Sequence, residues 1–418
     1  MDPPVFAGGL RIAPEFVRLF FYCADAGSRD SSATPTRQSF CMKTILVFAG
    51  TRPEIIKMAP IVRELRARQR SQTARKKTWS AHFCFSGQHY ELAVPFLKYF
   101  DTKPDSHLNV MESGQSLGQL RSRATAQLDA FFKCRPRACA ALVQGDTTTA
   151  FVAALSAFDH KVPVGHVEAG LRTSDITEPF PEELNRRLIT RIAKWHYAPT
   201  ERARQVLLAE KVAPESIILT RNTGIDSLLW ASNQSYEPAL KDLATLDGKR
   251  LVLVTAHRRE SIGAPLKRIA SALVKLAREF RDATFILPVH KNPQVARIIR
   301  GDLARTRNIL LTEPLEYPDF VWAMKRAELI ITDSGGIQEE AASLKKPVLV
   351  VRNETERTEA IDYGTSFLVG SDPNRLIIMA KEFLTGQRKL ALKSAVSPFG
   401  DGAAARRIVD HLLAHILS

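Results

Sequence analysis

Residues 329–340 read LIITDSGGIQEE, and this stretch carries the clearest structural signal in the sequence. Its first four residues predict a buried strand, and the Ser-Gly-Gly that follows is typical of a turn into a helix. Because backbone N–H groups are free at a helix N-terminus, Ser334, Gly335 and Gly336 suit a diphosphate group. Glu340 lies one helical turn further on, where its carboxylate would accept hydrogen bonds from ribose hydroxyls. The alternative is that the glycines only allow close packing of the helix on the sheet.

The same strand–turn–helix pattern recurs along most of the chain, which predicts parallel sheets with helices on both faces. Helix candidates in the first half lie at residues 55–69, 117–132, 182–193 and 201–210. The strand candidates are residues 44–48, 81–85, 140–143, 164–167, 196–198 and 217–219 in the first half, and 251–255, 284–287, 309–311, 329–332, 348–351 and 367–369 in the second. We therefore predict an α/β fold with two Rossmann-like domains that face each other across a cleft.

The chain has 418 residues, more than the ~250–300 at which a single hydrophobic core usually stops growing. We predict an N-terminal domain at 42–231, a polar linker at 232–249 and a C-terminal domain at 250–397. The helix pattern within 398–418 is expected to cross back to the first domain. Residues 1–41 include a Ser- and Thr-rich stretch without helical or strand period, so we expect a disordered or irregular extension there.

The formal net charge of +15 favours anionic partners, which include nucleic acids, membrane surfaces and phosphorylated metabolites. A nucleic-acid reader motif and an aromatic platform within a basic stripe are both missing from the sequence. No apolar run reaches the ~18–20 residues of a membrane span, and the start of the chain lacks the pattern of a secretory leader. We expect a cytoplasmic protein that binds neither nucleic acid nor membrane.

A glycine turn, Gly50-Thr51-Arg52-Pro53-Glu54, follows the first strand candidate and leads into a helix that bears Lys57. Free N–H groups at the helix start, together with Arg52 and Lys57, suit an anion. The alternative is a tight turn with a surface arginine. Neither the G-x-G-x-x-G fingerprint nor a Walker lysine pattern is present, and no cysteine pairs have zinc-site spacing. We expect no nicotinamide cofactor and no metal.

Carboxylates follow two neighbouring strand candidates, Asp146 after 140–143 and Glu168 after 164–167. A further pair, Glu182-Glu183, opens a helix candidate. Ligands of open parallel sheets lie beyond the carboxyl ends of the strands, so these side chains are expected on one edge. Carboxylates gathered in a cleft raise each other's pKa, which lets one site hold both a base and an acid near neutral pH. Asp146 could instead be only the N-cap of the helix that begins near Thr148.

Two histidines also directly follow strand candidates. His257 opens the run His257-Arg258-Arg259-Glu260, whose charged side chains favour a position in the cleft over one in the core. His290 follows the strand candidate at 284–287 in the same way. We predict both as cleft residues.

Six stretches taken in order resemble the non-hydrolysing UDP-N-acetylglucosamine 2-epimerases: residues 50–54, 144–147, 166–172, 181–186, 257–260 and 333–340. The resemblance extends from Met42 nearly to the end of the chain. It implies the two-domain GT-B glycosyltransferase-like fold, an active site in the interdomain cleft, a UDP-sugar ligand and a homodimer. It also implies a reaction that needs no cofactor.

The resemblance gives roles to individual residues where the motifs match. Asp146, Glu168 and Glu182 resemble the essential acids of the family, and His257 resembles a cleft residue close to the leaving diphosphate. The substrate-binding positions are Arg52 and Lys57 beside sugar and phosphate, Ser334, Gly335, Gly336 and Glu340 at the UDP, and His290 and Arg357 along the cleft.

The reaction implied by the resemblance eliminates UDP across carbons 1 and 2 of the sugar and then adds it back after protonation on the other face. Such chemistry needs a carboxylate base, a carboxylic acid and stabilisation of the departing diphosphate. The resulting sugar nucleotide would supply cell-surface polysaccharide. Two alternatives remain: an epimerase of a related UDP-2-acetamido sugar, and a UDP-sugar glycosyltransferase of the same fold.

Overall fold

The computed structural model describes residues 42–73, 78–87, 90–256, 263–290, 292–301 and 303–417. Within these residues the N-terminal domain has a seven-stranded parallel sheet in the order β3-β2-β1-β4-β5-β6-β7. Its strands are β1 (Lys43–Ala49), β2 (Trp79–Phe85), β3 (Ser106–His107), β4 (Ala138–Gln144), β5 (Val164–Val167), β6 (Trp195–Ala198) and β7 (Ile217–Leu219). Its helices are α2 (Arg52–Ser71), α3 (Tyr90–Tyr99), α4 (Leu117–Lys133), α5 (Thr148–Asp159), α6 (Glu182–Ile192), α7 (Glu201–Ala209) and α8 (Thr223–Ser232).

The C-terminal domain has a second parallel sheet, with six strands in the described residues and the order β10-β9-β8-β11-β12-β13. Its strands are β8 (Arg250–Thr255), β9 (Ala283–Pro288), β10 (Ile309–Thr312), β11 (Ala327–Thr332), β12 (Val348–Val350) and β13 (Ser366–Leu368). The helices of this half are α9 (Lys241–Ala244), α10 (Ala264–Glu279), α11 (Pro293–Ile299), α12 (Tyr317–Arg326), α13 (Gly335–Ser343), α14 (Thr358–Tyr363), α15 (Pro373–Leu384) and α16 (Ala404–Leu417).

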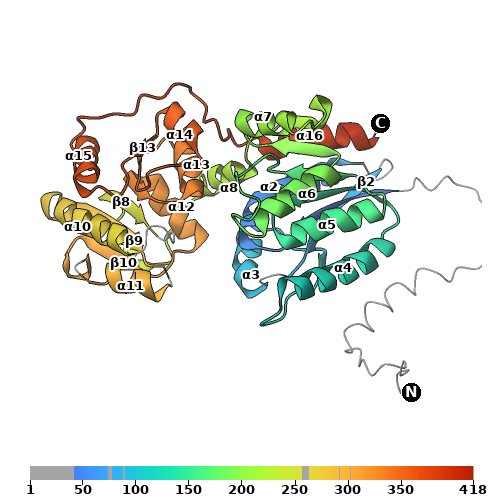
Figure 1. Ribbon diagram of the computed structural model, residues 1–418, viewed down its shortest axis with the longest axis horizontal. Coiled ribbons are helices and arrows are strands. Elements are labelled where there is room, and N and C mark those ends of the chain that lie inside the picture. The colour runs from blue at the N-terminus through green and yellow to red at the C-terminus, as the bar shows by residue number, and fades with distance from the viewer. Residues whose placement is uncertain are drawn as a thin grey trace, which may run out of the picture.

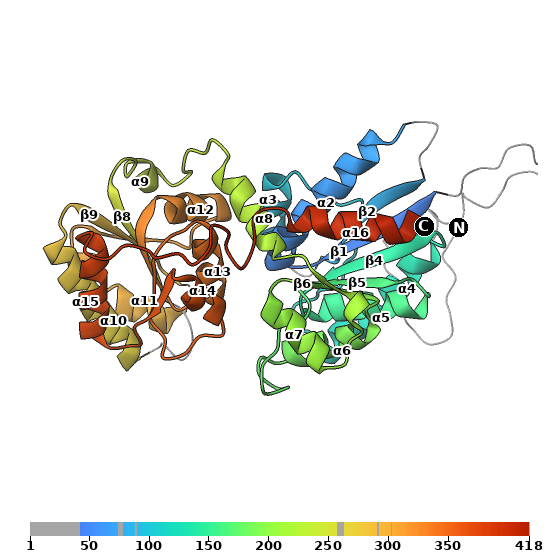
Figure 2. The same cartoon turned by 90° about the horizontal axis from the view of Figure 1, so that it is seen from above.

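Helices cover both faces of each sheet, as Figures 1 and 2 show. In the N-terminal domain α2 contacts α3, α8 and α16, whereas α5 contacts α4 and α6. In the C-terminal domain α10 packs against α11 and α15. The two domains meet where α8 contacts α12 and α13, and one hydrophobic cluster runs through this contact. The predicted fold class, α/β with two Rossmann-like domains, is confirmed.

Helix α2 contains a proline in its interior, and the fold compensates for the missing N–H. Pro60 cannot donate to the carbonyl oxygen of Ile56, one helical turn earlier. The hydroxyl of Ser227, in α8, donates to that oxygen instead. Because of the proline, the carbonyl oxygen of Ile56 is available to accept this hydrogen bond, which joins α2 to the helix at the domain boundary.

The last helix, α16, lies on the N-terminal domain although the segment before it belongs to the other half of the chain (Figure 2). Its first N–H groups, those of Ala404 and Ala405, donate to the Asp226 carboxylate at 3.2 and 2.8 Å. Burial raises the pKa of Asp226 to about 6. Asp226 therefore caps α16 from α8, and it anchors the returning chain next to the domain boundary.

Candidate active site

A cavity of about 1170 Å³ lies between the two domains, beside the carboxyl ends of β1, β4 and β5. One wall holds Lys57, Asp146 and Glu168 from the N-terminal domain. The opposite wall includes Glu339 in α13 and Arg357, which directly precedes α14. The cavity therefore occupies the edge at which open parallel sheets bind their ligands.

Glu168 follows β5 in a left-handed backbone conformation, with φ of +65°. Such a conformation is unfavourable for a residue other than glycine and recurs at functional sites. Both oxygens of its carboxylate lie 2.6 Å from Lys57 Nζ, and the side-chain amide of Gln144 also donates to it. Burial lowers the pKa of Lys57, but the charge of Glu168 and the hydrogen bond to it outweigh this effect and raise the pKa. Lys57 therefore carries a positive charge in the cavity.

Asp146, which follows β4, has a carboxylate oxygen 2.9 Å from a guanidinium nitrogen of Arg186. Burial raises the pKa of Asp146 to about 6. The charge of Arg186 opposes this rise, whereas the negative charges of Glu168 and Glu182 add to it. Asp146 therefore exchanges its proton close to neutral pH.

The N-cap of α5 is Thr147, whose hydroxyl accepts a hydrogen bond from the backbone N–H of Ala150 at 3.0 Å. The alternative in which Asp146 serves only as the N-cap of this helix is therefore wrong. The carbonyl oxygen of Asp146 accepts from the amide of Asn185 at 2.8 Å, which ties the loop after β4 to α6.

The two adjacent glutamates at the start of α6 have different environments. Glu183 is fully buried, and its carboxylate accepts from the N–H of Thr173 at 3.1 Å and from the guanidinium of Arg187 at 2.7 Å. Glu182 is half-buried and lies outside the lining of the cavity. The negative charge of Glu182 still affects the site, because it raises the pKa of Asp146.

The loop after β1 is organised by Glu54, a carboxylate that the sequence analysis did not single out. Glu54 is 2% exposed and accepts from the N–H groups of Gly50 and Thr51, at 3.0 and 2.8 Å, and from the hydroxyl of Thr147 at 2.8 Å. Burial raises its pKa. Arg52, at the start of α2, is exposed, and its guanidinium carbon lies 6.0 Å from the ring centre of Phe96 in α3. The lining of the cavity includes Thr51, Pro53, Glu54 and Lys57 from this loop and helix, but not Arg52.

The Ser-Gly-Gly motif lies where β11 ends and α13 begins, with Ser334 as the N-cap. A side-chain carbon added at Gly336 would meet no atom of the described residues within 4 Å, so packing against this part of the chain does not require the glycine. A carbon added at Gly335 would lie 3.2 Å from a carboxylate oxygen of Glu356 and 3.6 Å from the guanidinium carbon of Arg357. The helix start is therefore open at Gly336 and adjoins the cavity lining at Gly335.

A chain of hydrogen bonds connects the two walls of the cavity. The amide nitrogen of Asn222, the N-cap of α8, donates to one carboxylate oxygen of Glu339 at 2.6 Å. Arg357 donates to the other oxygen of Glu339. Burial lowers the pKa of Arg357, but the charges of Glu339 and Glu356 outweigh this effect and raise it. Glu340, next to Glu339, has a pKa of about 7 because of burial and the charge of its neighbour.

Neither Glu339 nor Asn222 was predicted from the sequence as a site residue. The two residues are 117 positions apart, and no short-range pattern indicates that they meet. Sequence alone carries a signal only for Asn222, which precedes a helix and is a favoured N-cap residue.

The two predicted histidines have different outcomes. His257 lies outside the described residues. His290 follows β9, is exposed, and accepts a hydrogen bond at Nδ1 from the backbone N–H of Asn292 at 3.1 Å. It does not belong to the lining of the cavity.

Across the residues that the structure describes, no group of three or more histidine, cysteine or acidic side chains is arranged to hold a metal ion. A search of the same residues finds no helix with the length and apolar character needed to cross a membrane.

The family model for UDP-N-acetylglucosamine 2-epimerase matches residues 71–413 of this chain. The UDP-N-acetylglucosamine 2-epimerase of Escherichia coli (strain K12) is 44% identical over 380 residues, which cover 89% of this chain and 98% of that protein. The enzyme of the same name from Bacillus subtilis (strain 168) is 42% identical over 376 residues, covering 90% of this chain and 96% of the relative.

Solved structures resemble this fold as well. The crystal structure of UDP-GlcNAc 2-epimerase from Neisseria meningitidis bound to UDP-GlcNAc has a TM-score of 0.74 and 38% identity, with 89% of this chain and all of that chain covered. The enzyme from Methanocaldococcus jannaschii in complex with UDP-GlcNAc and UDP has a TM-score of 0.70 and 31% identity, at 89% and 100% coverage.

Proposed function

The chain belongs to the UDP-N-acetylglucosamine 2-epimerase family, and we propose that it interconverts UDP-N-acetylglucosamine and UDP-N-acetylmannosamine by eliminating UDP and adding it back. The observation that carries the proposal is the composition of one wall of the cavity. Asp146, with a pKa of about 6, and Glu168, paired with Lys57, follow adjacent strands and line the same space. A glycosyltransferase of the same fold would need the UDP site but not this group of acids.

The carboxylates account for the two proton transfers. In the elimination, the C2–H bond breaks and its proton passes to a carboxylate, while its electron pair forms the C1=C2 double bond. The C1–O bond breaks as this double bond forms, and its electrons leave with UDP. On return, a carboxylic acid on the opposite face protonates carbon 2 and UDP adds again to carbon 1. We assign one transfer to Asp146 and the other to Glu168, because both line the cavity and the raised pKa of Asp146, about 6, suits proton exchange near neutral pH.

Glu182 has a supporting place in this proposal. Its negative charge raises the pKa of Asp146, which favours the protonated form that returns a proton to the sugar. The sequence prediction that Glu182 is itself a catalytic acid stays a prediction.

Arg357 on the opposite wall and the start of α13 next to it are suited to the departing diphosphate. We assign the diphosphate to Ser334, Gly335, Gly336 and Arg357, with Lys57 reaching it from the other domain. Support comes from the open helix start at Gly336 and from the positive charges that Arg357 and Lys57 keep in the cavity. Glu340 is assigned to the ribose hydroxyls. His257, Arg52 and His290 keep their predicted positions beside the ligand as predictions.

We also propose that the protein is a homodimer whose product serves the synthesis of a cell-surface polysaccharide. Apolar surface supports the dimer: Phe158 in α5 is 61% exposed and Leu188 in the adjacent helix α6 is 38% exposed. Light scattering of the purified protein would check the assembly, and a monomer mass at micromolar concentration would contradict it.

The test of the reaction is a conversion carried out in D₂O and followed by NMR. We expect deuterium at carbon 2 of the product, because a proton returned by a solvent-exchanging carboxylic acid comes from water. Slow release of free UDP with 2-acetamidoglucal is expected as well. Dialysis against EDTA and omission of NAD should leave the rate unchanged. Product whose original hydrogen is fully retained at carbon 2 would exclude the elimination.

A further inference from the structure

A second large groove lies at the opposite edge of the C-terminal sheet from the active-site cavity. Its volume is about 1060 Å³, close to that of the cavity itself. The amino ends of β9 and β10, contributing Thr284 and Ile309, form part of its floor, and α10 with the segment after α9 forms its sides. We call it the amino-edge groove. Since the active site is at the carboxyl ends of the strands, a ligand in this groove would not compete for space with the sugar nucleotide.

The charge of the amino-edge groove is strongly one-sided. A single carboxylate, Asp242, lines it. The cations are Lys249, Lys275, Arg278, Arg281, Arg305 and Arg307. All six are exposed, and none forms an ion pair with any acidic residue of the described chain. Other arginines of this domain differ: the exposed Arg300, Arg326 and Arg388 and the half-buried Arg250 are each paired with a carboxylate.

We propose that the amino-edge groove binds a compact ligand that carries several phosphate groups. One phosphate would neutralise only part of the six cations, whereas three or four linked phosphates match their charge. No aromatic side chain lines the groove, so it lacks the stacking platform of single-stranded nucleic-acid sites. The concave shape and the lack of exposed large apolar residues among its lining do not suit a bilayer surface.

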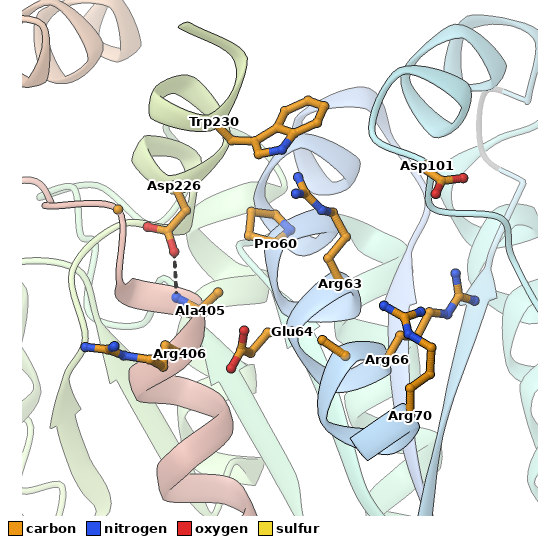
Figure 3. A pocket seen from close by; sticks show the side chains of 12 residues that line it. Pro60, Arg63, Glu64, Arg66, Arg70, Asp101, Asp226, Trp230, Ala405 and Arg406 are labelled. Atoms are coloured by element: carbon orange, nitrogen blue, oxygen red, sulfur yellow. Dashed lines mark hydrogen bonds between the residues drawn. The ribbon is translucent and has the colours of Figure 1, made fainter. Parts of the chain in front are cut away.

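The pocket in Figure 3 is the rival site for such an anion. It lies between α2, α8 and α16 and is smaller, at about 390 Å³. In this pocket the guanidinium carbon of Arg63 lies 4.2 Å from the ring centre of Trp230, and the guanidinium of Arg66 forms an ion pair with the carboxylate of Asp105. Three acidic residues, Glu64, Asp101 and Asp226, offset most of the charge of its four arginines, whereas the amino-edge groove has one acidic residue for six cations. The larger groove is therefore the stronger candidate, and the small pocket provides a matched control.

Isothermal titration calorimetry with inorganic triphosphate tests the proposal, after UDP-N-acetylglucosamine has been added to saturate the active site. We expect one site per chain, orthophosphate binding at least about tenfold weaker, and affinity that falls steeply with salt. The double variant Arg305→Glu with Arg307→Glu should weaken triphosphate binding by about a hundredfold, at roughly tenfold or more per lost contact. Both side chains are exposed, so the epimerase rate should be unchanged.

The control is Arg70→Glu with Arg406→Glu, which removes the same charge from the pocket of Figure 3. This variant should bind triphosphate as the parent chain does. Equally weakened triphosphate binding in both variants would show that only the net charge of the protein matters. Loss of triphosphate binding in the control variant alone would place the site in the small pocket. Either result, or no binding of triphosphate beside a saturated active site, would overturn the proposal. Binding of a nucleic-acid duplex without binding of triphosphate would replace the proposed ligand by nucleic acid.

Discussion

Replacing Arg186 by methionine is expected to move the pH dependence of epimerisation to higher pH. The active form of the proposed pair carries one proton, since one carboxylate must accept a proton while the other group returns one. Asp146 holds that proton with a pKa of about 6, so kcat/KM is expected to fall on the alkaline side of this value. The positive charge of Arg186 lowers the pKa of Asp146, so the loss of this charge should raise that pKa.

The size of the shift follows from the geometry. The guanidinium nitrogen lies 2.9 Å from the carboxylate oxygen. Opposite charges about 4 Å apart interact by roughly 4 kcal/mol at an effective dielectric constant of about 20, which corresponds to about three pKa units. The Asp146 side chain is 30% exposed, so solvent screening makes both the interaction energy and the pKa shift smaller than these values. We therefore expect the alkaline limb of the pH profile to move to higher pH by about one to two pH units.

The assay is the initial rate of epimerisation below KM, followed by NMR over about pH 5 to 9, because kcat/KM reports the pKa values of the free enzyme. Arg186→Lys is the matched control, since it keeps the charge and should keep the limb within about half a unit. Thermal unfolding should be recorded in parallel, because Arg186 also lies 3.3 Å from the buried Glu183. An alkaline limb that stays in place, or moves to lower pH, in a folded methionine variant would refute the role given to Asp146.

The other predictions concern four parts of the molecule. Asp146→Asn and Glu168→Gln should each lower kcat by about 10²–10⁴, as loss of an acid–base group does, and near-normal turnover in either folded variant would exclude that residue. Ser334→Ala should raise KM for the UDP-sugar with little change in kcat, because its hydroxyl is assigned to diphosphate binding; a large loss of kcat alone would contradict this. Asp226→Ala should reduce the free energy of unfolding by about 1–2 kcal/mol through loss of the α16 cap, as measured by urea denaturation. A chain that begins at Met42 should retain full activity, because all six stretches that resemble the epimerases lie beyond this residue.

Much of the fold could be predicted because parallel strands are buried on both faces and appear as short apolar runs. The run at residues 164–167 coincides with β5, and the run at 217–219 coincides with β7. The two-residue strand β3 was missed, since so short an element has no periodicity to detect. The segment 232–249, predicted as a polar linker, contains the short helix α9.

The site was predicted less completely, and the reason is physical. Strand ends locate Asp146 and Glu168 on one edge, but no local pattern states that Glu168 pairs with Lys57, 111 residues earlier. Nor does the sequence distinguish Glu182 from Glu183, which are adjacent letters. Successive residues on a helix point about 100° apart, so one carboxylate is buried among arginines and the other faces the surroundings of Asp146.

The proposed chemistry draws on both domains, and the side-chain amide of Asn222 is one link between their contributions. The side-chain oxygen of Asn222 accepts from the N–H of Gly224 at 2.8 Å and caps α8, while its nitrogen donates to Glu339. An amide has one acceptor oxygen and one donor nitrogen, so the cap dictates that the nitrogen faces the carboxylate. The other oxygen of Glu339 holds Arg357, the cation assigned to the diphosphate. The start of a helix in the N-terminal domain thus sets the position of a charge in the C-terminal domain. A change in the angle between the domains must alter this chain of contacts, and so it must also alter the distance between the leaving diphosphate and the carboxylates that transfer the proton.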